Sequence, residues 1–280
     1  MKEYIVELIR KAQTDLPEDV ERALRDAYER EEGDIAKLQL ENILKNVRLA
    51  REHALPMCQD TGIPIFYMKL GKNEDHEKIK EAIIEGVREA TVAIPLRPNI
   101  VDPLNRENPG DNTGTDMPYI NWSFSEDEST EIIYMPKGAG SENTSALRML
   151  KPSDGVQGIK DFVLETVKRA GGNPCPPTII GIGIGGSFDV SAKLAKEALL
   201  RPLSSYNSIE EIAKLERGLL RLINQTGIGP MGLGGKTTSL KVNIKVASCH
   251  TASLPVAVNI QCWAHRIARM RIRGDEIEIS

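Results

Sequence analysis

Hydrophobic residues recur every three or four positions through the first part of the chain, from Val20, Leu24 and Ala27 onward. This spacing places apolar side chains on one face of a helix, so it predicts a helical N-terminal region over about residues 1–54. The segment Asp15–Val20 combines acids with a proline, as expected where a helix begins. The spacing breaks again at Glu32–Asp34, which contains a glycine. We expect this region to serve packing.

Beyond residue 60, strand-like and helix-like segments follow one another. Runs rich in apolar and β-branched residues predict strands at 63–70, 118–124, 131–136, 178–182 and 240–246. Helical spacing predicts helices at 75–90, from 137–145 onward, and at 159–170, 187–200, 209–223 and 256–271. The acidic turn 125–129 separates two predicted strands and favours an antiparallel hairpin. The pattern indicates a mixed α/β (α+β) fold, a helical N-terminal region followed by an α/β body with mixed sheets.

The segment from Leu96 to Asp116 is rich in proline, asparagine and glycine and has neither helical nor strand periodicity. Loops of this length are uncommon inside a compact domain unless they carry a function. The segment contains Arg97 and Arg106.

Composition limits the function classes. The 280 residues include 40% hydrophobic and 27% charged residues, enough for one large domain or two lobes. We treat residues 1–280 as one catalytic domain. The net charge of −4 argues against a general nucleic-acid binder, which needs a basic face, so an anionic substrate would need a local positive pocket. The chain has no apolar run of membrane-spanning length and starts without a leader, which predicts a cytoplasmic protein whose thiols stay reduced or bind metal.

Glycine, proline or acid and amide residues flank three of the four cysteines, Cys58, Cys175 and Cys262. Turn segments often carry ligands and catalytic groups. Three thiolates would leave one iron of an iron–sulfur cluster free to act as a Lewis acid. The alternative is that the cysteines are small buried thiols packed as hydrophobes. Cys249 is a fourth cysteine, which three thiolate ligands leave without a role.

Two glycine-rich stretches resemble nucleotide-binding loops. Gly181–Gly186 matches G-x-G-x-x-G, but the nearest acids beyond it, Glu210 and Glu211, fall at the start of a predicted helix. Gly229–Thr238 resembles the end of a P-loop, but Pro230 stands where a glycine is needed and has no amide hydrogen for a phosphate. Both stretches could instead be tight turns with positive φ, or could offer backbone amides to an anion.

Several motifs occur in the same order as in a known family. These motifs are Cys58–Gly62, Lys137–Asn143, Gly183–Gly186, Gly232–Thr238 and Cys249–Pro255. With them, the chain resembles the α subunit of class I iron–sulfur fumarate hydratases and the related L-tartrate dehydratases over nearly its whole length.

The resemblance implies a hydro-lyase that converts fumarate reversibly to (S)-malate, with L(+)-tartrate dehydration as the alternative. It implies that Cys58, Cys175 and Cys262 bind a [4Fe–4S] cluster with an open iron. It also implies that substrate meets Gln59, Asp60, Arg97, His250 and the backbone around Gly140. Asp60 is our candidate acid or base, and His250 would hold a substrate oxygen. Cys249 matches no ligand and is expected to be a buried neighbour of His250.

Single-chain members of this family continue into a second domain that carries further site residues, whereas this sequence ends at Ser280. The resemblance therefore implies a β subunit as partner, in an assembly such as α2β2. The basic segment Arg266–Arg273 would close the last predicted helix, facing that partner or complementing the helix dipole. His53, His76 and His265 are interpreted as structural or solvated residues on helices. A dinucleotide-dependent oxidoreductase and a non-catalytic iron–sulfur sensor remain as alternatives from other classes.

Overall fold

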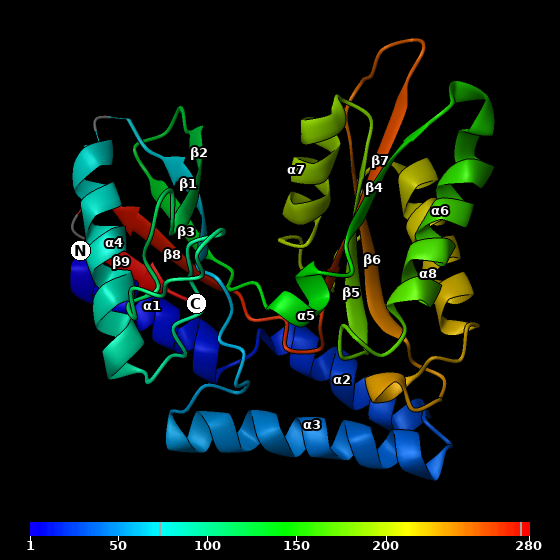
Figure 1. Cartoon of the computed structure of the whole chain (residues 1–280), viewed down its shortest axis with the longest axis horizontal. Helices are drawn as coiled ribbons and strands as arrows, with labels where there is room; N and C mark the ends of the chain where they lie inside the picture. Colours follow the sequence, from blue (N-terminus) through cyan, green and yellow to red (C-terminus); the bar gives the residue numbers. More distant parts are fainter. Residues whose placement is uncertain (73, 275) are drawn as a thin grey trace. The chain divides into compact units, whose positions relative to one another are not determined.

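The computed structural model describes residues 1–72, 74–274 and 276–280 (Figure 1). They form two compact units. The first unit contains Met1–Pro17, Lys45–Ala139 and Arg266–Ser280, and the second contains Glu18–Leu44 and Gly140–His265. None of the helices in the described part of the chain is long and apolar enough to cross a membrane. The predicted mixed α/β fold class is confirmed.

The predicted helical N-terminal region is also confirmed. It consists of α1 (Lys2–Thr14), α2 (Glu18–Arg30) and α3 (Asp34–His53). Helix α1 buries Ile5 and Ile9 completely or nearly so, in a core that it shares with α4 (His76–Ala93). Asp75 precedes α4, and its side chain accepts hydrogen bonds from the first turn, which explains why the helix begins there.

The first unit contains a five-stranded sheet in the order β2-β1-β3-β8-β9. Its strands are β1 (Ile65–Leu70), β2 (Tyr119–Phe124), β3 (Thr130–Tyr134), β8 (Ala268–Arg273) and β9 (Glu276–Ile279). Helices α1 and α4 supply the apolar side chains that pack against one face, where Phe66, Met68 and Met270 are fully buried. Strand β1 runs parallel to β2, and the other pairs are antiparallel.

The predicted hairpin between β2 and β3 is wrong, because β1 lies between these two strands and pairs with both. All residues of β1 except Lys69 are buried, whereas β2 is partly exposed along its whole length. A strand that is buried on both faces gains most from having a neighbour on each side. The acidic turn therefore connects β2 and β3 across β1, which lies between them in the sheet.

The predicted helix over 256–271 is also wrong. This segment forms β7 (Leu254–Gln261) and the beginning of β8. Val256, Val258 and Ile260 alternate along β7 and enter the core of the second unit, which is the two-residue period of a strand. Since no helix ends at Arg273, the basic residues there do not complement a helix dipole. The helix predicted from Lys137 onward is only the short α5 (Ala139–Glu142), followed by an unpredicted strand, β4 (Ala146–Leu150).

The second unit contains a four-stranded sheet in the order β4-β7-β5-β6, with β5 (Thr178–Ile184) and β6 (Ser239–Val246) as the remaining strands. Helices α6 (Gly155–Ala170) and α8 (Glu210–Asn224) lie on one side of this sheet and α7 (Phe188–Ala198) on the other (Figure 1). Two short 3-10 helices lie at Pro152–Asp154 and Pro230–Gly232. The apolar core includes Ile180, Val242 and Val258.

The first glycine-rich stretch allows α7 to pack closely on β5. A Cβ atom placed on Gly181 would lie 2.1 Å from the carbonyl oxygen of Ala195, and one on Gly183 would lie 2.0 Å from that of Ser191. Real Cβ atoms cannot approach backbone so closely. These glycines therefore have a packing role that needs no nucleotide.

We expect Gly183→Ala to lower the free energy of unfolding by about 3 kcal/mol, because the added methyl group overpacks the contact between β5 and α7. Gly218→Ala is the matched control, since a Cβ at this position of α8 meets no atom within 4 Å. That change should raise stability by roughly 0.5–1 kcal/mol through higher helix propensity. Urea unfolding followed by circular dichroism measures both effects. Equal stabilities for the two variants would contradict the packing role.

Candidate active site

The turn that carries Cys58 follows α3 and is fixed by hydrogen bonds to two helices. The backbone N–H of Met57 donates to the carbonyl oxygen of Gln13 at 3.0 Å, and the Gln13 side chain donates to the carbonyl oxygen of Thr61 at 2.8 Å. The Asn46 side chain of α3 donates to the carbonyl oxygen of Met57 at 2.7 Å. The turn therefore has a fixed backbone although Cys58 itself is only half-buried.

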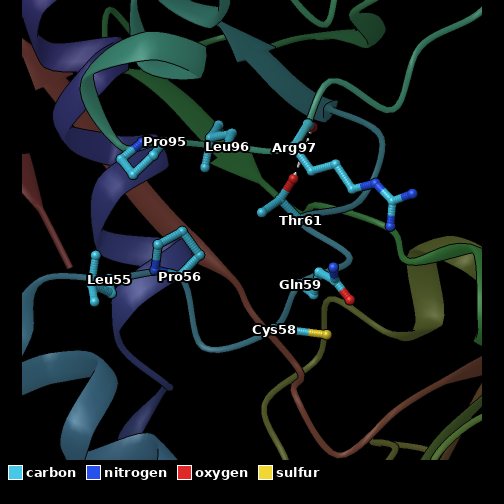
Figure 2. A pocket seen from close by; sticks show the side chains of 8 residues that line it. All are labelled: Leu55, Pro56, Cys58, Gln59, Thr61, Pro95, Leu96 and Arg97. Atoms are coloured by element: carbon cyan, nitrogen blue, oxygen red, sulfur yellow. Dashed lines mark hydrogen bonds between the residues drawn. The ribbon is translucent and has the colours of Figure 1, made fainter.

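A cavity of about 610 Å³ lies against this turn (Figure 2). The side chains of Cys58, Gln59 and Arg97 point toward the same side of it. The cavity is lined by Leu55, Pro56, Cys58, Gln59, Thr61, Pro95, Leu96 and Arg97. The Thr61 hydroxyl donates to the carbonyl oxygen of Arg97 at 3.1 Å. The structure thus brings a thiol, an amide and a guanidinium together at one cavity, and all three belong to the candidate residues that the resemblance implied.

The long loop that carries Arg97 is held by side-chain amides. Asn112 donates to the carbonyl oxygen of Arg97 at 3.1 Å and accepts from the backbone N–H of Asn99 at 2.7 Å. The Asn99 side chain donates to the carbonyl oxygen of Gly62 at 3.2 Å. These contacts fix the backbone of Arg97 relative to the Cys58 turn, while its side chain is exposed and lines the cavity.

The Asp60 carboxylate is hydrogen-bonded to backbone on both oxygens. Oδ1 accepts from the N–H of Gly62 at 3.0 Å, and Oδ2 accepts from the N–H of Ala139 at 2.7 Å. A Cβ on Gly138 would lie 3.1 Å from Oδ2, a tight contact, so the absence of a side chain at Gly138 favours this approach. Asp60 therefore links the cysteine turn to the first residue of α5. Its role in moving a proton stays a prediction.

In the second unit, Cys175 lies on a loop with an unusual backbone. Its φ is 53°, in the left-handed region that residues other than glycine rarely adopt. Its N–H donates to the carbonyl oxygen of Gly172, and its own carbonyl oxygen accepts from the N–H of Trp263 at 3.3 Å. Trp263, the residue after Cys262, is thus hydrogen-bonded to the backbone of Cys175. A Cβ on Gly140 would lie 3.2 Å from the carbonyl oxygen of Asn173, so these three predicted residues are neighbours.

The second glycine-rich stretch supports the Cys175 loop. Gly229 and Gly232 have positive φ values of 69° and 75°, which confirms the interpretation as tight turns. A Cβ on Gly232 would lie 2.5 Å from Cα of Gly172, and the N–H of Met231 donates to the carbonyl oxygen of Pro176 at 2.8 Å. This stretch therefore packs against the Cys175 loop and is hydrogen-bonded to it.

His250 lies on an exposed loop between β6 and β7. Its Nδ1 accepts a hydrogen bond from the N–H of Ala252 at 3.1 Å, so the neutral ring carries its proton on Nε2 and can donate from there. The expectation that Cys249 is buried is wrong. Cys249 is exposed, and its thiol donates to the carbonyl oxygen of Ser253 at 3.3 Å, because the whole loop lies at the surface.

The predicted site residues belong to both units. Cys58, Gln59, Asp60 and Arg97 lie in the first unit, and Gly140, Cys175, His250 and Cys262 lie in the second. The described part of the chain contains no group of three or more His, Cys, Asp or Glu side chains that could hold a metal ion. The three-cysteine ligand set therefore stays a prediction.

The other histidines have separate roles. His53 and His76 are exposed on α3 and α4, as expected. His265 does not lie on a helix; it is buried between β7 and β8, with Nε2 3.0 Å from the carbonyl oxygen of Leu199. Sequence reasoning also missed Arg266, which is buried and donates to the carbonyl oxygen of Asp60. The sequence offered one signal for the burial of Arg266: the arginines of 266–273 alternate with apolar residues, as in a strand.

Comparison with known proteins agrees with the motifs. The family model for fumarate hydratase (Fumerase) matches residues 2–271. The putative L(+)-tartrate dehydratase subunit alpha of Methanocaldococcus jannaschii is 55% identical over 280 residues, which covers 98% of each chain. The L(+)-tartrate dehydratase subunit alpha of Escherichia coli (strain UTI89 / UPEC) is 34% identical over 264 residues, which covers 94% of this chain and 87% of the relative. The chain therefore belongs to the fumarate hydratase (Fumerase) family.

Proposed function

We propose that this chain is the α subunit of an iron–sulfur hydro-lyase that hydrates fumarate reversibly to (S)-malate. The observation that carries the proposal is the shared cavity of Cys58, Gln59 and Arg97, in a member of this family. A thiol supplies a metal ligand, and a guanidinium and an amide supply donors for carboxylate oxygens. This is the combination that a diacid hydro-lyase needs on one side of its substrate.

The proposed cofactor is a [4Fe–4S] cluster held by Cys58, Cys175 and Cys262. The three thiols fit as donors, because each is free of disulfide and partly exposed. Cys58 also points toward the cavity, and the Cys175 and Cys262 segments are bonded to each other. When bound, a cluster with one iron lacking a protein ligand supplies a Lewis acid that polarises the substrate hydroxyl.

The side chains of this chain would bind and orient the diacid. Arg97 can hold one carboxylate through two parallel N–H donors, and Gln59 can donate to an oxygen beside it. His250 would donate from Nε2, because its Nδ1 is already an acceptor. Removing a proton next to a carboxylate builds negative charge on that group, so donors fixed in advance stabilise the transition state. We assign Asp60 an orienting role, since both of its oxygens bind backbone.

The part of the cavity that this chain supplies has few polar side chains besides Gln59 and Arg97. Leu55, Pro56, Pro95 and Leu96 add no polar side-chain group, and the Thr61 hydroxyl already donates to Arg97. The additional hydroxyl of tartrate would need a further polar partner, or it would be buried unpaired. L(+)-tartrate dehydration is the second candidate, because the relatives at 55% and 34% identity carry that name.

The proposed partner is a β subunit in an assembly such as α2β2, since these relatives are named subunit alpha. Such a partner would complete the cavity and exclude water from the bound substrate. Water exclusion strengthens the interaction of Arg97 with a carboxylate, because the local dielectric constant falls.

The function is tested by preparing the full chain with its β partner, rebuilding the cluster without oxygen, and assaying fumarate, malate and both tartrate enantiomers. We expect kcat/KM for fumarate and malate to exceed that for either tartrate at least about tenfold, and the chain without its partner to be inactive. A reversed preference would favour the tartrate candidate. Tight retention of NAD with no dehydration of any of these acids would reject the hydro-lyase.

A further inference from the structure

Arg266 is a fully buried cation beside the Cys58 turn. Its side chain is 1% exposed and is the largest of the fully buried side chains in the described residues. Nη1 donates to Oε1 of Gln13 at 2.9 Å, and Nη2 donates to the carbonyl oxygen of Asp60 at 2.9 Å. Nε has no hydrogen-bond partner among the described residues. Burying a guanidinium in this way is costly, so the contacts that it makes call for an explanation.

The acceptors of Arg266 are neutral groups. Gln13 offers an amide oxygen and Asp60 a backbone carbonyl oxygen. Tyr134 lies on the same network, since Gln13 Nε2 is 3.4 Å from its hydroxyl oxygen. Burial raises the pKa of Tyr134 to about 12, although Gln13 and Arg266 both act to lower it. Tyr134 is therefore a neutral phenol near pH 7, and the carboxylate of Asp60, which lies near Arg266 beside Gly138, is the nearby anionic group.

The contacts of Arg266 and Gln13 converge on one short segment. Arg266 holds the carbonyl oxygen of Asp60, while Gln13 holds that of Thr61 and, through its own carbonyl oxygen, the N–H of Met57. Cys58 and Gln59 lie between these fixed points, and their side chains point toward the cavity. The direction of both side chains depends on the backbone that Arg266 and Gln13 hold.

We propose that Arg266 is a positioning residue that fixes the direction in which Cys58 and Gln59 face the cavity, through its hydrogen bond to the Asp60 carbonyl group. The positioning follows from the contacts alone, and its consequence for catalysis rests on the proposed hydro-lyase function. Loss of Arg266 should therefore disorder the turn locally.

Hydrogen–deuterium exchange of the full chain without cluster tests the positioning directly. In Arg266→Met, we expect the amides of residues 57–63 to exchange about tenfold or more faster, while those of β1 and β3 keep their protection. Arg266→Lys keeps the charge and one donor, so it should fall between the wild type and Arg266→Met. If Arg266→Met does not fold, Arg266→Lys alone tests the proposal by the same exchange measurement. Arg269→Met is the matched control on β8, where Arg269 pairs with Glu131 at the surface at 3.7 Å, and should leave residues 57–63 unchanged.

Unchanged exchange at residues 57–63 in both Arg266 variants would overturn the proposal. Equally faster exchange across the whole first unit would also overturn it, since that result would show general loosening. The assembled enzyme gives the second measurement: we expect Arg266→Lys to lower kcat and to alter the visible spectrum of the cluster, with Arg269→Met unaffected. If wild-type protein shows the local protection but no hydro-lyase activity with any diacid, the proposed function fails while the positioning of the turn stands.

Discussion

Serine in place of Cys58, Cys175 or Cys262 is expected to remove the iron–sulfur cluster and to lower hydro-lyase activity at least about a thousandfold. A serine hydroxyl keeps the shape of the side chain but remains protonated at neutral pH, so it is a poor ligand for iron in place of a thiolate. Each of the three thiols is partly exposed, as a ligand of the proposed cluster has to be. Iron content, visible absorbance and malate dehydration measure the effect.

Cys249→Ser is the matched control for this series. Cys249 is exposed, and its thiol donates to the carbonyl oxygen of Ser253, a bond that a serine hydroxyl can also make. We therefore expect this variant to keep its iron and most of its activity. If Cys249→Ser lost the iron while Cys262→Ser kept it, the assignment of ligands would be wrong. Thermal unfolding of all four apo variants separates loss of the cluster from loss of the fold.

Helices were predicted well where end signals and spacing agree. Helix α4 has a capping aspartate, Asp75, and apolar residues at helical spacing, and it forms at nearly the predicted residues. The segment from Val256 failed because consecutive apolar residues fit either period, and pairing of β7 with two strands decided the outcome. The hairpin failed because β2 and β3 lie near each other in sequence, whereas β1 had the greater need of neighbours on both sides.

The candidate site was predicted from motifs rather than from patterning. Nothing in the spacing of Cys58 and Arg97 shows that they share a cavity, since β1 and α4 separate them in sequence and the loop that carries Arg97 has no periodicity. The contacts that fix the loop come from side-chain amides of Asn99 and Asn112, which sequence reasoning treats as ordinary loop residues. Arg266 was misplaced for a related reason, because its partners Gln13 and Asp60 are distant in sequence.

Arg97→Met is expected to lower kcat/KM for the diacid on the order of 100-fold and to leave the cluster spectrum intact. Methionine keeps the length of the side chain but removes the fork of donors and the positive charge that bind a carboxylate. The loss of one charged partner in a partly buried pair costs about 2–5 kcal/mol, so an effect of this size is expected. A rise in KM larger than the fall in kcat would show that Arg97 binds substrate and transition state alike.

Arg106→Met is the matched control, because Arg106 is exposed on the same loop and does not line the cavity. This variant changes the net charge by the same amount, so it removes one unit of long-range attraction for a dianion without removing a direct contact. We expect less than about a twofold change at physiological ionic strength, where surface charges are screened over roughly 8 Å. Similar losses in both variants would mean that the loop acts through its overall charge. A large loss confined to Arg97→Met identifies the guanidinium in the cavity as the carboxylate ligand.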